Sequence, residues 1–186
     1  MNALGRGFVA VVPPDDVLDA IDARVAPVRI AHDGLRWTRR EQWHLTLRFL
    51  GPVPDVEGVV AALQDSLAGV PHVDALGLGG AGAFPNARRA SVVWLGVRDG
   101  SEALARVAAA VESASVVAGF PPEPRPFRPH VTVARVPRPR EVGAIVDALG
   151  EGPIGPPWPV EAVVLVASDT RSTGAVYSEV ARVPLA

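Results

Sequence analysis

Two histidines occur in the same short frame at distant places in the sequence. The first lies in WHLTLRFLG, at His44, and the second lies in PHVTVAR, at His130. Each is followed by an apolar residue, a threonine and another apolar residue. Alternate side chains of a β-strand share one face, so His44 should project together with Thr46, and His130 with Thr132. The pattern predicts two strands that each present an imidazole and a hydroxyl on one side.

Two imidazoles and two hydroxyls in one cleft would suit in-line attack on a phosphodiester without a metal ion. Histidine titrates near pH ~6.5, so one ring can take a proton from water while the other gives one to the departing oxygen. The threonine hydroxyls can donate hydrogen bonds to the non-bridging oxygens. Arginines add positive charge near both motifs, at Arg36, Arg39, Arg40, Arg48, Arg125, Arg128, Arg135, Arg138 and Arg140.

A single His-x-Thr triplet is a weak signal, because a histidine in an alternating strand is usually structural. Its recurrence is what favours catalysis. His32 and His72 lack matching surroundings and are expected at the surface. The histidines lack metal-ligand spacing and no carboxylate adjoins the motifs, so a zinc site is not expected. GLGGAG lacks the lysine of a phosphate-binding loop and is interpreted as a flexible loop.

Apolar and alternating runs bounded by proline and glycine predict the secondary structure. The predicted strands cover residues 7–12, 44–50, 73–78, 91–97, 130–134, 160–167 and 175–183, with a short strand near Trp37. Helices are predicted to begin at Asp15, Pro54, Ser101 and Pro139, and the first should end at Pro27. The segments predicted as loops or turns are GLGGAGAFPNARR, GFPPEPRPFRP, GEGPIGPPWP and SDTRSTG.

Landmarks of the two chain halves recur at a spacing of 85 or 86 residues. The matched pairs are Val9 and Trp94, Asp15 and Ser101, His44 and His130, and Pro54 and Pro139. This repetition predicts an internal duplication of a β-α-β-α-β unit, over about residues 1–87 and 88–186. The two units are expected to form interleaved, pseudo-symmetric lobes of a single domain, 1–186, and to share one cleft.

Composition narrows the class of protein. The chain has 186 residues, of which 48% are hydrophobic, and a net charge of −2, which argues against coating long nucleic acid but not against binding one RNA end. There is no cysteine and all 18 basic residues are arginine, which excludes thiolate metal sites and lysyl–nucleotide intermediates. With no targeting segment or long apolar stretch, we expect a soluble, cytoplasmic protein that does not bind membranes.

The segments HLTLRFLG and FRPHVTVAR resemble the paired His-x-Thr-x motifs of the 2H phosphoesterases. Within that superfamily they resemble the RNA 2′,3′-cyclic phosphodiesterases, also called 2′-5′ RNA ligase-like proteins. RGFVAVVPP is similar to the opening strand of that family, GAFPNARRASVVWLGV to its central loop and strand, and GAVYSEVARVPL to its closing strand. The resemblance covers nearly the whole chain.

The resemblance implies a bilobal α+β fold in which two antiparallel sheets form a central cleft with helices outside. It also implies hydrolysis of RNA 2′,3′-cyclic phosphate ends to 2′-phosphate, without metal or cofactor, and its reversal as 2′-5′ ligation. The partners would be RNA 3′ ends or small cyclic nucleotides, and the protein would be a monomer.

The same resemblance assigns roles within the motifs. His44 matches the proton donor to the departing 3′ oxygen, and His130 matches the base that activates water. Thr46 and Thr132 match hydroxyls that contact the phosphate. The near symmetry of the site leaves the assignment of acid and base open.

Arg135 and Phe49 each lie five residues after a motif histidine. They resemble the arginine of the family that contacts phosphate and its aromatic residue that contacts the base. Simple strand alternation would turn both side chains away from the cleft, unless a β-bulge or a strand end re-aims them.

Two other functions stay open at this point. The chain could be a 2H relative that opens another small cyclic phosphate, such as ADP-ribose cyclic phosphate, or that cleaves 2′-5′ oligonucleotides. It could also be a module that binds RNA ends without turnover. Intact histidine and threonine in both motifs favour an enzyme.

Overall fold

Strands and helices alternate along the chain in the computed structural model, which describes residues 3–171 and 174–186. The strands are β1 (Leu4–Val11), β2 (Arg36–Trp37), β3 (Leu45–Val53), β4 (Val73–Phe84), β5 (Ala90–Asp99), β6 (His130–Arg140), β7 (Pro153–Val160), β8 (Ala162–Arg171) and β9 (Gly174–Pro184). The helices are α1 (Asp15–Ala31), α2 (Val56–Leu67), α3 (Ser101–Val117) and α4 (Gly143–Leu149), with short 3₁₀ helices η1 (Arg40–Gln42) and η2 (Ala87–Arg89).

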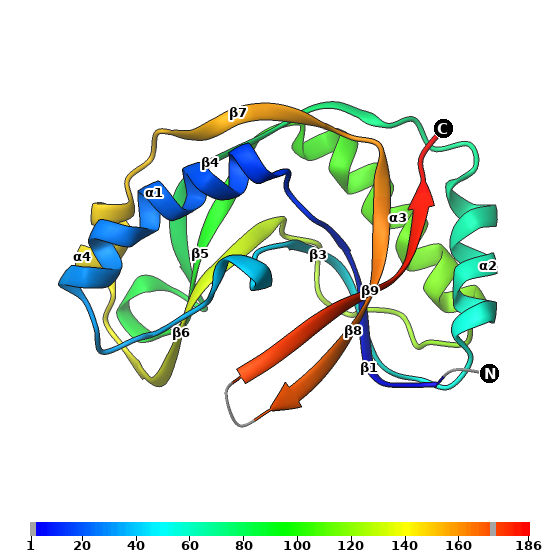
Figure 1. Cartoon of the computed structure of the whole chain (residues 1–186), viewed down its shortest axis with the longest axis horizontal. Helices are drawn as coiled ribbons and strands as arrows, with labels where there is room; N and C mark the ends of the chain where they lie inside the picture. The colour runs from blue at the N-terminus through cyan, green and yellow to red at the C-terminus, as the bar shows by residue number, and fades with distance from the viewer. Residues whose placement is uncertain (1–2, 172–173) are drawn as a thin grey trace.

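All the strands belong to one antiparallel sheet of nine strands, curled as Figure 1 shows. Its order is β7-β4-β5-β6-β3-β1-β8-β9, and β2 pairs with β6 beside β3. Helices α1 and α4 cover the half that contains β4 and β7, and α2 and α3 cover the half that contains β3 and β9. The predicted α+β class is confirmed, and the two expected sheets are halves of one sheet that join at β6 and β3.

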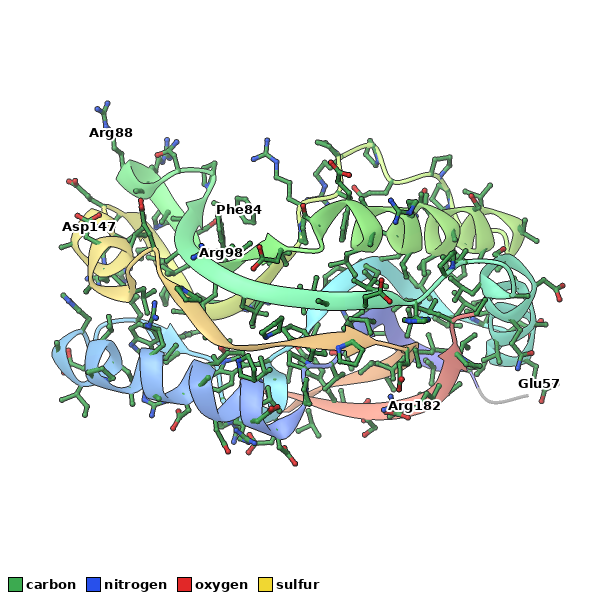
Figure 2. All side chains as sticks on the ribbon, turned by 90° about the horizontal axis from the view of Figure 1, so that it is seen from above. Glu57, Phe84, Arg88, Arg98, Asp147 and Arg182 are labelled. Carbon is green, nitrogen blue, oxygen red and sulfur yellow. The ribbon has the colours of Figure 1, made fainter. Side chains whose placement is uncertain are left out.

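The main apolar core lies between the sheet and the helices, and it includes Ile21, Leu63 and Leu104. A second, smaller cluster is formed by Phe8, Ala10, Val164 and Val166, with Tyr177 packed against it. Strand β1 contributes to both, because alternate residues of a strand face opposite sides of the sheet. The charged side chains of Asp147 on α4 and Glu57 on α2 extend outward at opposite ends of the molecule (Figure 2).

The sheet order is symmetrical about the junction of β6 and β3, since β5 and β1 flank it and β4 and β8 follow. Helices α1 and α3 each have 17 residues. Helix α1 packs against β7 and α4, whereas α3 packs against β3 and α2. Each of these helices therefore covers the half of the sheet to which its preceding strand does not belong. The internal duplication and its boundaries stay a prediction.

Two segments predicted as loops are strands. The glycine-rich segment after Leu78 continues β4 to Phe84, because its missing side chains make room for a ring: a Cβ on Gly82 would lie 2.3 Å from Cζ2 of Trp94. Gly80, with a φ of 74°, lies where the register between β4 and β5 shifts. The proline-rich run GEGPIGPPWP contains most of β7, which is an edge strand and so tolerates residues without an N–H.

Two proline predictions were also wrong. Pro27 lies inside α1, which continues to Ala31, and buried Val28 packs that last turn against the core. Pro139 lies near the end of β6, and α4 begins only at Gly143, so the Pro54–Pro139 match does not mark two helix starts. The other predicted helix starts agree within two residues. Within SDTRSTG, β8 extends to Arg171 and β9 begins at Gly174, while Ser172 and Thr173 lie outside the described residues.

Candidate functional site

A cleft of about 1690 Å³ lies over the junction of β3 and β6. Its lining contains all four polar residues of the two motifs, which are His44, Thr46, His130 and Thr132. The structure therefore brings together residues that are far apart in the sequence, as the repeated motif predicts.

The register of β3 and β6 explains this arrangement. Leu45 pairs with Val131, and both side chains are fully buried on the core side. Extending the antiparallel register by one residue in each direction aligns His44 with Thr132, and Thr46 with His130. The four polar side chains then share the face opposite to the buried pair.

Each motif histidine is oriented by the carbonyl group two residues before it. His44 Nδ1 lies 2.8 Å from the oxygen of Gln42, and His130 Nδ1 lies 2.7 Å from the oxygen of Arg128. A carbonyl can only accept, so Nδ1 carries the proton in both rings and Nε2 of a neutral ring has a lone pair that can accept a hydrogen bond or a proton. Thr46 Oγ1 donates to His44 Nε2 at 3.0 Å. Both rings are thus prepared to exchange a proton through Nε2.

Burial controls the protonation of the pair. It lowers the pKa of His44 from 6.5 to about 4; the hydrogen bond to Gln42 opposes this shift, and the charges of His130 and Arg135 add to it. Burial also lowers the pKa of His130, against the hydrogen bond to Arg128. The effect of His130 on His44 shows that the two rings share one electrostatic environment. In the free protein both rings are neutral at pH 7.

Aromatic rings hold His44 in place. Phe8 of β1 stacks on it, with ring centroids 4.6 Å apart and an interplanar angle of 25°. Tyr177 of β9 meets it edge-on at 5.2 Å. Phe8 and Tyr177 also contact each other at 5.1 Å, so the three rings form one packed group.

His130 has a similar aromatic environment. Phe84 of β4 meets it edge-on at 4.9 Å, and Trp94 of β5 lies 6.3 Å away. Trp94 Nε1 is buried and has no hydrogen-bond partner among the described residues. Sequence reasoning used Trp94 only as a landmark of the repeat and did not single out the other rings. A signal was present, because Phe8 and Trp94 are separated by the same 86 residues as the motif histidines.

A β-bulge brings Phe49 to the cleft face. Strand β3 carries one extra residue, Leu47, opposite β1, so that the alternation reverses after Thr46. Phe49 then lines the cleft, is 48% exposed and packs on Phe8 at 5.5 Å. The expectation from simple alternation was wrong for this residue.

A second bulge does the same for Arg135. In β6 the extra residue is Val133, which lies between the residues that pair with Val93 and Trp94 of β5. Arg135 therefore shares the face of Thr132, lines the cleft, and adds its charge to the field at His44. The alternation argument failed here for the same reason.

Some of the arginines near the motifs have structural partners. Arg48 is 8% exposed, and its Nε lies 2.5 Å from Glu112 Oε2 while Nη1 lies 3.5 Å from Glu123 Oε2. Arg125 also pairs with Glu123. These charges are already balanced by carboxylates.

The remaining arginines divide by position. Arg40 pairs with carboxylates of α1, and Arg138 and Arg140 do not line the cleft. Arg39 also lines the cleft. Of the other cleft-lining arginines, Arg36, Arg128 and Arg135 have no acidic partner among the described residues.

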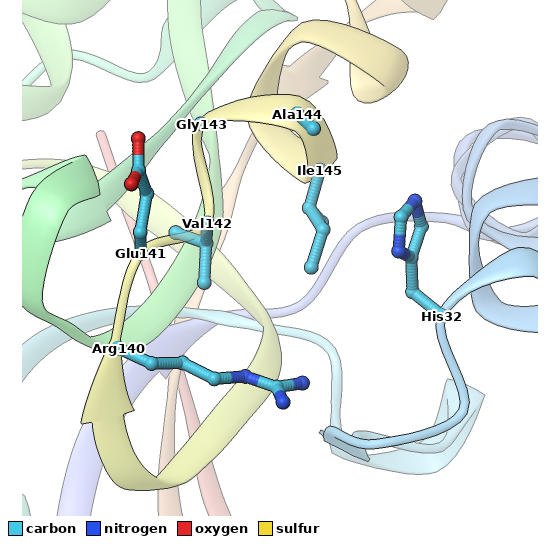
Figure 3. Close-up of a pocket in the computed structure, with 7 residues that line it drawn as sticks. All are labelled: His32, Arg140, Glu141, Val142, Gly143, Ala144 and Ile145. Atoms are coloured by element: carbon cyan, nitrogen blue, oxygen red, sulfur yellow. The ribbon is translucent and has the colours of Figure 1, made fainter.

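A smaller hollow of about 450 Å³ lies between the end of α1 and the start of α4. Arg140 and His32 extend toward it from opposite sides, whereas the Glu141 carboxylate points away (Figure 3). It contains neither motif histidine. His72 is exposed, beside Asp74, and also lies outside the cleft.

The described residues contain no group of three or more histidine or acidic side chains arranged to hold a metal ion. They also contain no helix with the length and apolar character needed to cross a membrane.

Comparison with known proteins identifies relatives that agree with one another in family. A family model described as the 2′-5′ RNA ligase superfamily matches residues 15–171. A protein of Aeropyrum pernix named RNA 2′,3′-cyclic phosphodiesterase is 40% identical over 133 residues, which cover 69% of this chain and 74% of that protein. A Thermus thermophilus protein of the same name is 33% identical over 185 residues, covering 93% and 86%.

Solved structures show the same fold. The crystal structure of TT0787 of Thermus thermophilus matches with a TM-score of 0.75 and 27% identity, over 97% of both chains. The crystal structure of E. coli LigT complexed with 3′-AMP matches with a TM-score of 0.75 and 25% identity, over 99% of both chains. These matches confirm the family resemblance that the two motifs carry.

Proposed function

Because the chain belongs to the 2′-5′ RNA ligase superfamily, we propose that it hydrolyses RNA 2′,3′-cyclic phosphate ends to 2′-phosphates. One observation carries this proposal: His44 and His130 line one cleft, and each is oriented through Nδ1 so that Nε2 is left for proton transfer. The curated relatives that bear the name RNA 2′,3′-cyclic phosphodiesterase support the substrate.

The reaction needs one base and one acid on opposite sides of the phosphorus. Nε2 of His130 takes a proton from water as the water oxygen attacks phosphorus. Nε2 of His44 gives a proton to the 3′ oxygen as its bond to phosphorus breaks. Each transfer contributes roughly 10²–10⁴ to the rate. When the 5′-hydroxyl of a second RNA takes the place of water as the nucleophile, the same two proton transfers join the two RNA ends by a 2′-5′ linkage, and the reverse of that step regenerates the cyclic phosphate.

The low pKa of His44 has to be reconciled with the role of acid, because a proton donor must first be protonated. A phosphate anion bound between the rings favours their charged forms and raises both pKa values. Binding of the substrate therefore loads the proton that the free protein lacks. The hydroxyls of Thr46 and Thr132 and the guanidinium of Arg135 contact the phosphate oxygens, and Phe49 provides a surface on which the terminal base stacks.

The proposal includes the remaining expectations from the sequence. Since the described cleft-lining residues supply acid, base and positive charge, the reaction uses no metal or nucleotide cofactor. The protein acts as a cytoplasmic monomer on RNA 3′ ends or on small cyclic nucleotides.

The test is turnover of a short RNA with a 2′,3′-cyclic phosphate, measured in EDTA, with the product identified by ³¹P NMR. The wild-type protein should form the 2′-phosphate, and His44→Ala and His130→Ala should each lose roughly 10²–10⁴ of the rate. Near-normal turnover by either variant would contradict the mechanism. Tight binding without product would favour a binding module. Faster turnover of ADP-ribose cyclic phosphate or of 2′-5′ oligonucleotides in the same panel would favour a different substrate.

A further inference from the structure

Two arginines stand directly opposite each other at one end of the cleft. Arg36 of β2 pairs with Arg135 of β6 in the antiparallel ladder, and both line the cleft. Residues directly opposite in such a ladder project to the same face, where like charges are destabilising. An anion bound between or beside them would remove that repulsion.

No acidic side chain among the described residues offsets this pair. Within that part of the chain the side chain of neither Arg36 nor Arg135 has an ion pair or a hydrogen bond, whereas Arg40 of the neighbouring η1 is paired with Asp15 and Asp19. Both side chains of the pair are exposed. Their charge is therefore available to a ligand.

Their position relative to the histidines suggests which anion they bind. Strands β2 and β3 meet the same edge of β6 one after the other, with Trp37 opposite Ala134 and Leu45 opposite Val131. The level that Arg36 shares with Arg135 is three residues beyond the level of His44, which corresponds to at most roughly 10 Å of strand. Arg36 is also one strand away from His130 and Thr132, because it stands on β2 and they stand on β6.

Strand position separates the two arginines. Arg135 shares β6 with His130 and Thr132, and its charge contributes to the lowered pKa of His44, so it acts on the phosphate between the histidines. Arg36 stands on the neighbouring strand β2 and is placed to contact an anion one step further away. In a nucleotide chain the nearest such anion is the phosphate on the 5′ side of the terminal nucleotide.

We propose that Arg36 binds this 5′ phosphate, and that the protein distinguishes the end of an RNA chain from a free nucleoside 2′,3′-cyclic phosphate through it. The inference rests on the proposed hydrolase activity and specifies its substrate class. A guanidinium suits this task, because its fork of N–H donors matches a phosphate and its charge does not depend on pH.

The experiment compares two small substrates that differ only in this group: a nucleoside 2′,3′-cyclic phosphate, and the same compound with a 5′-phosphate. The wild-type protein should show a kcat/KM roughly tenfold higher for the 5′-phosphorylated compound. Arg36→Gln should lower this ratio to about one, and Arg36→Glu should lower it further. Arg138→Gln removes a charge outside the cleft from β6, the strand with which β2 pairs, and it should keep the wild-type ratio.

A second readout uses an oligoribonucleotide with a cyclic end. The logarithm of its affinity should fall with the logarithm of salt concentration, and Arg36→Gln should reduce that slope by about 0.7, the value for one phosphate of a single strand. Thermal unfolding of each variant separates loss of contact from loss of fold. Wild-type turnover without a preference for the 5′-phosphate, or an unchanged ratio in Arg36→Gln, would reject the role of Arg36 and leave the proposed hydrolase activity standing. Absence of turnover of both compounds by the wild-type protein would reject the hydrolase itself.

Discussion

Leu45 and Val131 pair across β3 and β6 with both side chains fully buried, and this pair joins the two halves of the sheet. His44 precedes Leu45 and His130 precedes Val131, so both imidazoles project from the sheet face opposite to the buried pair, one from each strand of the junction. One ladder pair thereby fixes the relative position of two histidine motifs that are 86 residues apart. The aromatic rings and carbonyl groups around the histidines then fix the orientation of each imidazole.

The buried position of His44 should make folding stability depend on pH in a defined window. Its pKa is about 4 in the folded protein and near 6.5 when exposed, so the unfolded chain takes up the proton first as the pH falls. Above pH 6.5 the ring is neutral in both states, so it does not change the free energy of unfolding. Between pH 6.5 and about 4 the free energy of unfolding decreases, by a total of about 3 kcal/mol. The lowered pKa of His130 acts in the same direction.

The measurement is urea unfolding of the wild-type protein and of His44→Gln at pH 7.5, 6 and 5. Glutamine cannot take up a proton, so the variant should lose less stability than the wild-type protein between pH 7.5 and 5. The value at pH 7.5 serves as the internal reference for any packing effect of the substitution. Parallel loss of stability in both proteins would show that His44 is not the group that titrates.

Much of the site follows from sequence because its physics is local. A histidine and a threonine two residues apart share a face in any strand, and a repeated spacing places two such strands in equivalent positions. The bulges at Leu47 and Val133 have no such local signal, and they decide whether Phe49 and Arg135 reach the cleft. Their positions depend on the register with neighbouring strands.

The errors in predicting the fold from the sequence have a similar origin. Glycines after Leu78 and prolines in β7 disfavour strands when they are read alone. In the structure Trp94 occupies the space that the glycines leave, and β7 needs partners on one side only. Both facts concern segments that are distant in sequence, so composition within a short window could not reveal them.

The close approach of Gly82 and Trp94 makes a further prediction. In Gly82→Ala the new methyl group would lie 2.3 Å from a ring atom of Trp94, so the indole must move. Overpacking of this kind costs about 1–3 kcal/mol. Because Trp94 adjoins His130, turnover of the cyclic phosphate should fall as well.

Gly69→Ala provides the matched control. Gly69 is exposed, and a Cβ there meets no atom within 4 Å, so stability and turnover should stay close to those of the wild-type protein. Urea unfolding and steady-state turnover of the two variants make the comparison. Equal behaviour of Gly82→Ala and Gly69→Ala would mean that the indole is not held against Gly82 in solution.

Acid and base in the histidine pair can be separated by the chemistry of the leaving group. An alcohol oxygen needs a proton as it departs, whereas a thiolate is a much weaker base and leaves without one. On a cyclic substrate with sulfur in place of the 3′ oxygen, His44→Ala should therefore recover to within roughly tenfold of the wild-type rate. His130→Ala should stay inactive on both substrates, because attack by water still requires a base.

The opposite pattern would exchange the two roles. It would be compatible with the free protein, in which His44 Nε2 accepts a hydrogen bond from Thr46 and burial favours the neutral ring. Equal loss by both variants on both substrates would show that neither ring acts only as the acid. Because the oxygen and sulfur substrates differ at the leaving atom and both require activation of water, the comparison isolates the proton transfer to the leaving group, the step assigned to His44.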